Sequence, residues 1–157
     1  MLIYSNEQNT HAPGNPGNIE MQDGYLTVRV VSSVDDSPMS RATVMIYSED
    51  HGRPVTNKVL ETGIDGNTEK VALSAPAKKY SLTATSIIVP YSRYTIRVEF
   101  PGFYTNVYQN SQVFADTTTI QESRMDPLPF GVRNAPGMEK VYTIPEPPKA
   151  RGMQKIK

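Results

Sequence analysis

The most regular hydrophobic pattern in the chain runs from Tyr91 to Met125. Large apolar side chains occupy every second position from residue 94 to residue 100, and polar residues stand between them. This alternation is typical of a strand with one buried face. Pro101-Gly102 interrupts it as a turn would, and further short apolar runs follow. The segment predicts two or three strands, and each large side chain that they bury would contribute about 1.5–3 kcal/mol.

Four shorter runs of the same kind precede this segment, beginning near Leu26, Val44, Val55 and Val71. Turns rich in Asp, Gly and Pro separate them. No window has the apolar spacing of an amphipathic helix. The sequence therefore predicts an all-β protein, a single seven-stranded antiparallel sandwich of the prealbumin or immunoglobulin-like type, with an extended arm at each end.

The pattern divides the chain into three regions. Residues 1–23 have no periodicity and predict an extended N-terminal arm, residues 24–130 form the sandwich, and residues 131–157 form a Pro-rich, basic-ended C-terminal arm. Within this last region, residues 138–144 can add an edge strand. Residues 77–90 fit neither the helical nor the strand period, so we expect a loop that folds over one end of the sandwich.

Composition narrows the class of protein. The 157 residues are 38% hydrophobic, with 13 Pro and 10 Gly, which fits a compact domain of about 100 residues with polar extensions. Sixteen acidic and sixteen basic residues cancel, so no overall field favours nucleic acid or an anionic membrane as a partner. The absence of cysteine excludes disulfides, thiolate metal sites and cysteine nucleophiles.

The N-terminus and the length of the apolar runs indicate where in the cell the protein is made. No apolar run is long enough to span a membrane, so membrane insertion is not expected. The first ten residues contain neither the basic nor the apolar region of a secretory signal. We therefore expect a protein made in the cytoplasm without a signal peptide.

Few residues suggest catalysis. His11 and His51 stand alone in polar segments, and the common nucleophile, zinc-protease and phosphate-binding motifs are absent. Glu99 alternates outward beside Arg97, which suits a solvated sheet face. A carboxylate pair of the glycosidase type has four candidates on sequence grounds, which are Glu61, Glu69, Glu99 and Glu122.

One short segment resembles a calcium loop. Oxygen donors alternate from Asp65 to Glu69, but the twelve-residue loop with its terminal bidentate Glu is missing. A plain β-turn is the preferred interpretation. We therefore expect no metal, no cofactor and no catalytic residue, and a protein that is not an enzyme.

Tyrosines are concentrated in one third of the chain. Because Trp is absent and Phe is scarce, some of them must fill the core, while a protein interface and a sugar-binding face are the alternatives. They are Tyr80, Tyr91, Tyr94, Tyr104 and Tyr108.

Several short motifs recur in an order that resembles a known domain. They are Ala75-Pro76, Pro90-Tyr91-Ser92, Gly102-Phe103, Gln112-Val113-Phe114 and Pro127-Leu128-Pro129. With the strand pattern of residues 24–128, they resemble the carboxypeptidase regulatory-like (transthyretin-like) β-sandwich. They are also similar to the N-terminal module of clostridial spore cortex-lytic enzymes and related peptidoglycan-associated proteins. The resemblance implies the fold and a cell-wall context. It implies no lytic activity, because the sequence ends at Lys157 and no catalytic residue lies in the matched region.

Two functional hypotheses follow. The first is a structural or adaptor protein of a multi-subunit particle, such as a phage tail or a phage-tail-like bacteriocin of a Gram-positive host, found in the virion or released particle. Its arms would dock onto neighbouring protein subunits, because extended arms cannot bury themselves. The candidate interface residues are Leu2, Ile3, Tyr4, Tyr104, Tyr108, Val141, Tyr142, Ile144, Lys155 and Lys157.

The alternative is a binding or regulatory module of the spore cortex or cell wall. Such a module would associate with peptidoglycan and hold a glycan or a lytic enzyme. The resemblance favours this hypothesis directly, and Tyr104 and Tyr108 would supply its glycan face.

Overall fold

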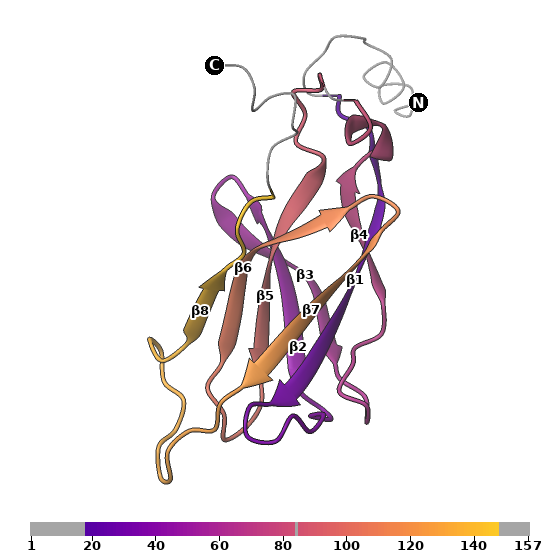
Figure 1. Cartoon of the computed structure of the whole chain (residues 1–157). Helices are drawn as coiled ribbons and strands as arrows, with labels where there is room; N and C mark the ends of the chain where they lie inside the picture. The colour runs from indigo at the N-terminus through magenta and orange to yellow at the C-terminus, as the bar shows by residue number, and fades with distance from the viewer. Residues whose placement is uncertain (1–17, 84, 148–157) are drawn as a thin grey trace, which may run out of the picture.

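Two β-sheets pack face to face in the computed structural model, which describes residues 18–83 and 85–147 (Figure 1). The larger sheet has the strand order β3-β2-β5-β6-β8, and the smaller has the order β4-β1-β7. The expected all-β sandwich is therefore confirmed. The strands are β1 (Met21–Ser32), β2 (Thr43–Asp50), β3 (Arg53–Glu61), β4 (Val71–Pro76), β5 (Tyr91–Glu99), β6 (Asn106–Phe114), β7 (Thr118–Met125) and β8 (Lys140–Thr143).

The expectation of a purely antiparallel sandwich is wrong. β1 pairs with β7 in parallel, from Tyr25–Thr118 to Ser32–Met125, and β6 pairs with β8 in parallel. Parallel neighbours need a long connection. The chain supplies one between β1 and β7 by building most of the larger sheet, and another between β6 and β8 by crossing to β7 and back. The structure thus has the seven predicted strands and β8, the edge strand expected within residues 138–144.

The core lies between the two sheets and follows the alternating pattern. Leu26, Val28 and Val30 of β1 and Ile96 and Val98 of β5 are all fully buried and belong to one hydrophobic cluster. These are the apolar positions that the sequence placed on inward strand faces. Burial of each such side chain contributes about 1.5–3 kcal/mol.

Residues 77–83 and 85–90 lie at one end of the sandwich, the upper end in Figure 1. The segment begins with a single 3-10 turn, η1 (Lys78–Tyr80). This turn is tied to the start of β1, because the N–H of Ala77 donates to the carbonyl of Glu20 at 2.8 Å and Lys79 Nζ lies 2.8 Å from the Glu20 carboxylate. These contacts hold η1 beside the residue that precedes β1.

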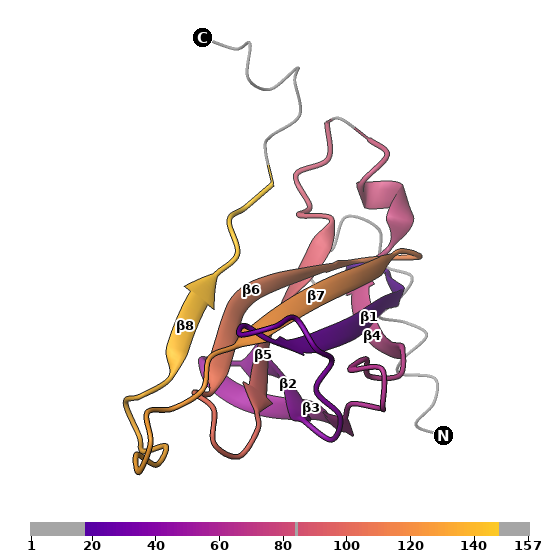
Figure 2. The same cartoon turned by 60° about the horizontal axis from the view of Figure 1, so that its bottom comes forward.

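The two sheets include residues from both of the regions expected to form arms. β1 begins at Met21, ahead of the expected boundary at residue 24, and residues 140–143 of the expected C-terminal arm are a strand of the larger sheet. A long loop leaves the sandwich after β7 and returns as β8 (Figure 2). Residues 1–17 and 148–157 lie outside the described part of the chain. No helix within the described residues is long and apolar enough to cross a bilayer.

Candidate interaction site

The C-terminal part of the described chain lies along the outer edge of the larger sheet. We call residues 140–146 the strap. Its first four residues are β8, which pairs with β6 in register from Asn106–Lys140 to Gln109–Thr143. The N–H of Ile144 then donates to the carbonyl of Gln109 at 2.9 Å. The strap therefore covers the backbone edge of β6 that would otherwise face solvent.

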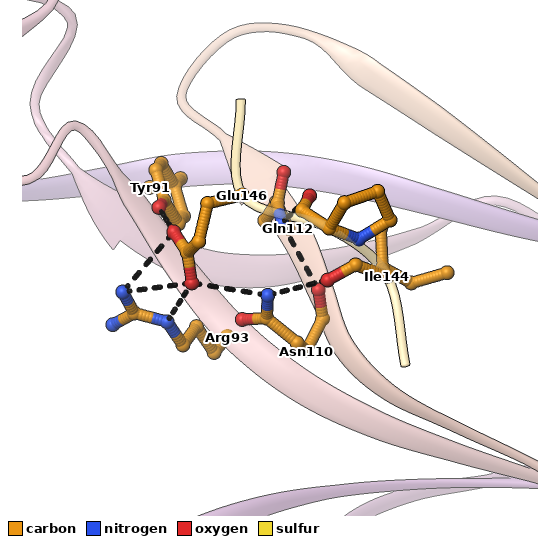
Figure 3. Close-up of polar contacts among 7 residues, drawn as sticks. Tyr91, Arg93, Asn110, Gln112, Ile144 and Glu146 are labelled. Carbon is orange, nitrogen blue, oxygen red and sulfur yellow. Dashed lines mark hydrogen bonds and ion pairs between the residues drawn. The ribbon is translucent and has the colours of Figure 1, made fainter. Parts of the chain in front are cut away.

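Side chains of β6 extend this pairing where the strand itself stops. Pro145 has no N–H and cannot continue a ladder. Instead, Asn110 Nδ2 donates to the carbonyl of Ile144 at 2.7 Å, and Gln112 Nε2 donates to the carbonyl of Pro145 at 3.0 Å (Figure 3). Two amide side chains of β6 thus donate to carbonyls of the strap beyond β8 and hold the extended segment in place.

Glu146 anchors the end of the strap through its carboxylate. The carboxylate accepts hydrogen bonds from the hydroxyl of Tyr91 and from Asn110 Nδ2, the latter at 3.1 Å, and Arg93 NH2 lies 3.3 Å from Oε2 (Figure 3). Tyr91 and Arg93 belong to β5, so Glu146 reaches across β6 to the next strand. The ion pair is half-exposed and contributes about 0–1 kcal/mol by itself. The ion pair serves mainly to fix the position of the end of the strap.

Aromatic packing adds a further contact between the strap and β6. The ring of Tyr142 stacks on Tyr108, with centroids 5.1 Å apart and planes at 15°. The Tyr108 hydroxyl donates to Ser123 Oγ at 2.9 Å and accepts from Asn106 Nδ2 at 3.2 Å. Burial raises the pKa of the Tyr108 hydroxyl. The strap therefore covers a tyrosine that is joined to the core.

The start of the strap is held by charge. Lys140 Nζ lies 2.5 Å from Asp126 Oδ2 and 4.8 Å from the ring centroid of Tyr104. Hydrogen bonds from Lys140 and then Ser33 lower the pKa of Asp126, and the same contact with Asp126 raises the pKa of Lys140. The strap is thus fixed at both ends as well as along its backbone.

The structure gathers half of the expected interface residues in this region. Tyr104, Tyr108, Val141, Tyr142 and Ile144 all lie on β6, on the strap or immediately before β6. Val141 and Tyr142 are 55% and 40% exposed. Tyr108 is 6% exposed and lies beneath Tyr142 of the strap. The other five expected residues, Leu2, Ile3, Tyr4, Lys155 and Lys157, lie outside the described residues.

Four residues that hold the strap were not identified from the sequence: Arg93, Asn110, Gln112 and Glu146. One signal was available, because Asn110 and Gln112 are two positions apart and so share a strand face. Glu146 gave no such signal. A single acid between prolines reads as a solvated residue until the fold places Tyr91 and Arg93 beside it.

Two of the four acidic candidates for chemistry, Glu99 and Glu122, are paired with cations. Arg97 Nε lies 2.7 Å from Glu99, as the alternation suggested for a solvated face, and Arg29 Nε lies 3.7 Å from Glu122. His51 contacts its neighbour Asp50 at the exposed tip of the β2–β3 hairpin. His11 lies outside the described residues.

In the turn at Asp65, both carboxylate oxygens of Asp65 accept hydrogen bonds from within the turn. Its two carboxylate oxygens accept from the backbone N–H and the side-chain Nδ2 of Asn67, each at 3.0 Å. These bonds lower the pKa of Asp65. Across residues 18–83 and 85–147, His, Asp and Glu side chains form no group of three or more that could hold a metal ion.

The chain has structural similarity to solved proteins at low sequence identity. No protein-family model and no curated protein sequence matches the chain. The chain is similar to a solved minor pilin of the Gram-positive pathogen Streptococcus agalactiae, with a TM-score of 0.45 and 13% identity over 73% of this chain and 48% of the pilin. It is also similar to part of a 9R-lipoxygenase from Cyanothece, with a TM-score of 0.31 and 14% identity over 92% of this chain and 20% of the lipoxygenase. The chain thus spans about half the length of the pilin.

Proposed function

We propose that this protein is a non-enzymatic structural or adaptor subunit of a multi-subunit particle, such as a phage tail or a phage-tail-like bacteriocin of a Gram-positive host. The observation that carries the proposal is the binding site of the strap on the outer edge of β6, which we call the seat. The domain holds an extended segment on a sheet edge by backbone pairing and by the side chains of Asn110, Gln112 and Arg93. Strand addition of this kind is a common way for proteins to bind one another.

The opposite edge of the larger sheet supports a second contact. β3 has no strand partner on its outer side within the described part of the chain, and nearly all of its residues are exposed. Val55 and Val59 are 42% and 62% exposed. Pro54 and Lys58 disfavour non-specific pairing of this edge with strands of other molecules. A partner that binds here would therefore have to accommodate these two side chains.

The loop between β7 and β8 supports a third contact. Its first turn places Phe130 at the apex, and the N–H of Val132 donates to the carbonyl of Pro129 at 3.0 Å. The Phe130 side chain is fully exposed. Exposed aromatic side chains are common anchors of protein interfaces. Phe130 would insert into an apolar pocket of a neighbouring subunit.

The proposal assigns the remaining chain and its partners as follows. Residues 1–17, with Leu2, Ile3 and Tyr4, and the basic tail with Lys155 and Lys157 contact neighbouring protein subunits. The protein is made in the cytoplasm, resides in the virion or released particle, and neither binds nucleic acid nor inserts into a membrane. The balanced charge of the chain supports this choice of partner.

Sedimentation of the native protein tests the proposal. Lysate of the protein's own host is separated on a gradient, and the chain is located by mass spectrometry. We expect it in a megadalton fraction together with other particle proteins. Recovery only as a free chain of 17.4 kDa would contradict the proposal.

The sequence resemblance favours one alternative function. The motifs that resemble the carboxypeptidase regulatory-like module of cortex-lytic proteins would make the domain a peptidoglycan-associated binding or regulatory module of the spore or cell wall. Because Tyr108 is buried, Tyr104 is the one remaining tyrosine of the suggested glycan face. Co-pelleting of the purified protein with peptidoglycan, and its loss in Tyr104→Ala, tests this alternative.

A further inference from the structure

We propose that the strap of one copy binds the β6 edge of a second copy, so that neighbouring subunits exchange residues 140–146. The partner is thus another molecule of this same chain. This inference rests on the proposed assembly role and specifies how two copies of the chain would be joined.

The seat supplies the backbone and side-chain groups that bind the strap, and the strap supplies the groups that they contact. β8 pairs with β6 as its single strand partner among the described residues. The residues after β8 contact side chains of β5 and β6, through Arg93, Asn110 and Gln112. None of these contacts requires the strap to belong to the same molecule. A strap from a second copy would make the same backbone pairs, the same Tyr142 stack and the same Glu146 anchor.

The loop before the strap has the properties of a hinge. It turns twice, at Pro129–Val132 and at Ala135–Met138, where Gly131 and Gly137 adopt positive φ of 82° and 92°. These two turns fold residues 127–139 back toward the sandwich. If they open, the same residues span about 40 Å as an extended chain. This is enough to carry the strap from its own domain to the edge of a neighbour.

Three prolines make the opened loop less costly. Pro127, Pro129 and Pro136 restrict the backbone and favour extended conformations. The loop residues from 129 to 137 are exposed, so opening exposes little additional apolar surface. The turns are held by one backbone hydrogen bond each, at 3.0 and 3.1 Å.

Two side-chain contacts also tie the loop to the sandwich. Asn134 Nδ2 donates to the carbonyl of Phe103 at 2.6 Å, and Glu139 Oε2 lies 3.4 Å from Arg97 NH2. Opening the hinge breaks these contacts and leaves both sheets intact.

The balance between the two arrangements depends on concentration. Because the contacts are the same, the strap stays on its own domain when its effective concentration there, in the millimolar range, exceeds that of other copies. Within a particle, neighbouring copies are held at fixed positions and high local concentration. Exchange is then favoured, and each exchanged strap links two subunits.

Engineered cysteines test the exchange, since the chain contains none of its own. Val107 and Val141 are register partners on β6 and β8. Adjacent strands lie about 4.8 Å apart, within the Cα separation of about 4.4–6.8 Å that a disulfide accepts. Full-length chains carrying Val107→Cys and Val141→Cys singly are mixed, unfolded and refolded together at high concentration, then oxidised. Exchange predicts a disulfide-linked heterodimer on a non-reducing gel.

A matched control measures chance collisions. Val59 is 62% exposed, like Val141 at 55%, but it lies on β3 at the opposite edge of the same sheet. The Val107→Cys chain mixed with a Val59→Cys chain gives the background yield. We expect the Val107/Val141 mixture to exceed it several-fold. A yield no higher than this background would overturn the proposal.

Charge reversal provides a second, independent test. In Arg93→Glu and in Glu146→Arg the anchor of the strap is repulsive within each chain. Exchange between the two variants restores an opposite-charge pair at both seats. We expect the mixture to form a dimer that neither variant forms alone, and its absence would contradict exchange. Either negative result would leave the assembly role intact, because sedimentation of the native particle tests that role separately.

Discussion

Gly24 lies directly against the backbone of Phe114, at the corner where β1 of the smaller sheet meets the end of β6. A Cβ placed on Gly24 would overlap the carbonyl oxygen of Phe114 and would lie 2.6 Å from Val113 Cγ1. Gly24 also forms an isolated antiparallel bridge with Ala115, the residue after β6. The absence of a side chain at this position is therefore what allows the sheets to close.

Gly24→Ala is expected to destabilise the domain by about 1–3 kcal/mol, because backbone at the corner must move to relieve the overlap. Urea unfolding followed by circular dichroism measures the change. Gly63→Ala is the matched control, since a Cβ there meets Asp65 Oδ1 at an ordinary 3.5 Å. If both variants were equally stable, the close approach at Gly24 would not limit the fold.

Asn106 is expected to be the most sensitive polar residue of the core. It is fully buried on β6, and its Nδ2 donates to Ser123 Oγ at 3.0 Å and to the carbonyl of Arg124 at 2.9 Å, both on β7. Asn106→Ala leaves that carbonyl without its donor and opens a small cavity. Loss of such a buried partner costs about 1–3 kcal/mol.

Chemical denaturation of Asn106→Ala and of Asn57→Ala measures the free energy of unfolding of each variant. The comparison distinguishes loss of the buried hydrogen bonds from the general effect of replacing Asn by Ala. Asn57 is exposed on β3. Its replacement should alter stability by less than about 0.5 kcal/mol. Equal effects for the two variants would show that the cross-sheet bonds of Asn106 do not stabilise the domain.

The strands and the core were predictable from local pattern, but the inward face of β6 was not. Asn106 and Tyr108 are buried at even positions, whereas Ser111 and Val113 are buried at odd positions. The change occurs at Asn110, which has φ of 65°, opposite a register irregularity in β5. A bulge reverses which residues face inward. Simple alternation therefore could not show that Tyr108 belongs to the core.

The strap was only half predictable for a related reason. Strand propensity around Val141 and Tyr142 identifies an edge strand from local sequence alone. Its partner and direction depend on the path of the loop after β7. Its anchor depends on Tyr91 and Arg93, which are far from Glu146 in the sequence. Contacts of that kind exist only once both sheets have formed, so no local pattern reports them.

Glu146→Gln is expected to loosen the strap while leaving the sandwich folded. The change removes the charge that pairs with Arg93 and one of the two acceptor oxygens. The amide of Ile144, bonded to Gln109 at 2.9 Å, should then exchange with deuterium several-fold faster. Amides of the buried strand β5 should be unchanged.

Hydrogen–deuterium exchange of Glu122→Gln gives the matched control. Glu122 also pairs with an arginine, Arg29 at 3.7 Å, but on β7 in the other sheet. Its replacement should leave the exchange of Ile144 as in the unaltered protein. Equal acceleration in both variants would mean that Glu146 does not anchor the strap.

The Asp126–Lys140 pair is expected to make attachment of the strap depend on pH. Hydrogen bonds from Lys140 and Ser33 hold the pKa of Asp126 below its ordinary value of 3.8. Because the folded pKa of Asp126 is lowered, the carboxylate stabilises the fold at pH values above its ordinary pKa. This stabilisation is lost as the pH falls through the folded pKa. The raised pKa of Lys140 contributes below its ordinary value of 10.5 and is lost as pH rises through the folded value. The pair is therefore intact between these two limits.

Asp126→Asn should consequently lower stability at neutral pH, and the loss should be smaller at about pH 2, because the contribution of Asp126 falls as pH drops through its lowered folded pKa. Thermal unfolding of the variant and the unaltered protein at the two pH values measures this difference. Asp116→Asn is the control, because Asp116 lies 4.0 Å from Lys78 on an exposed surface away from the strap. A destabilisation by Asp126→Asn that is equally large at both pH values would show that its effect is not electrostatic. The strap would then be held by backbone pairing and Glu146 alone.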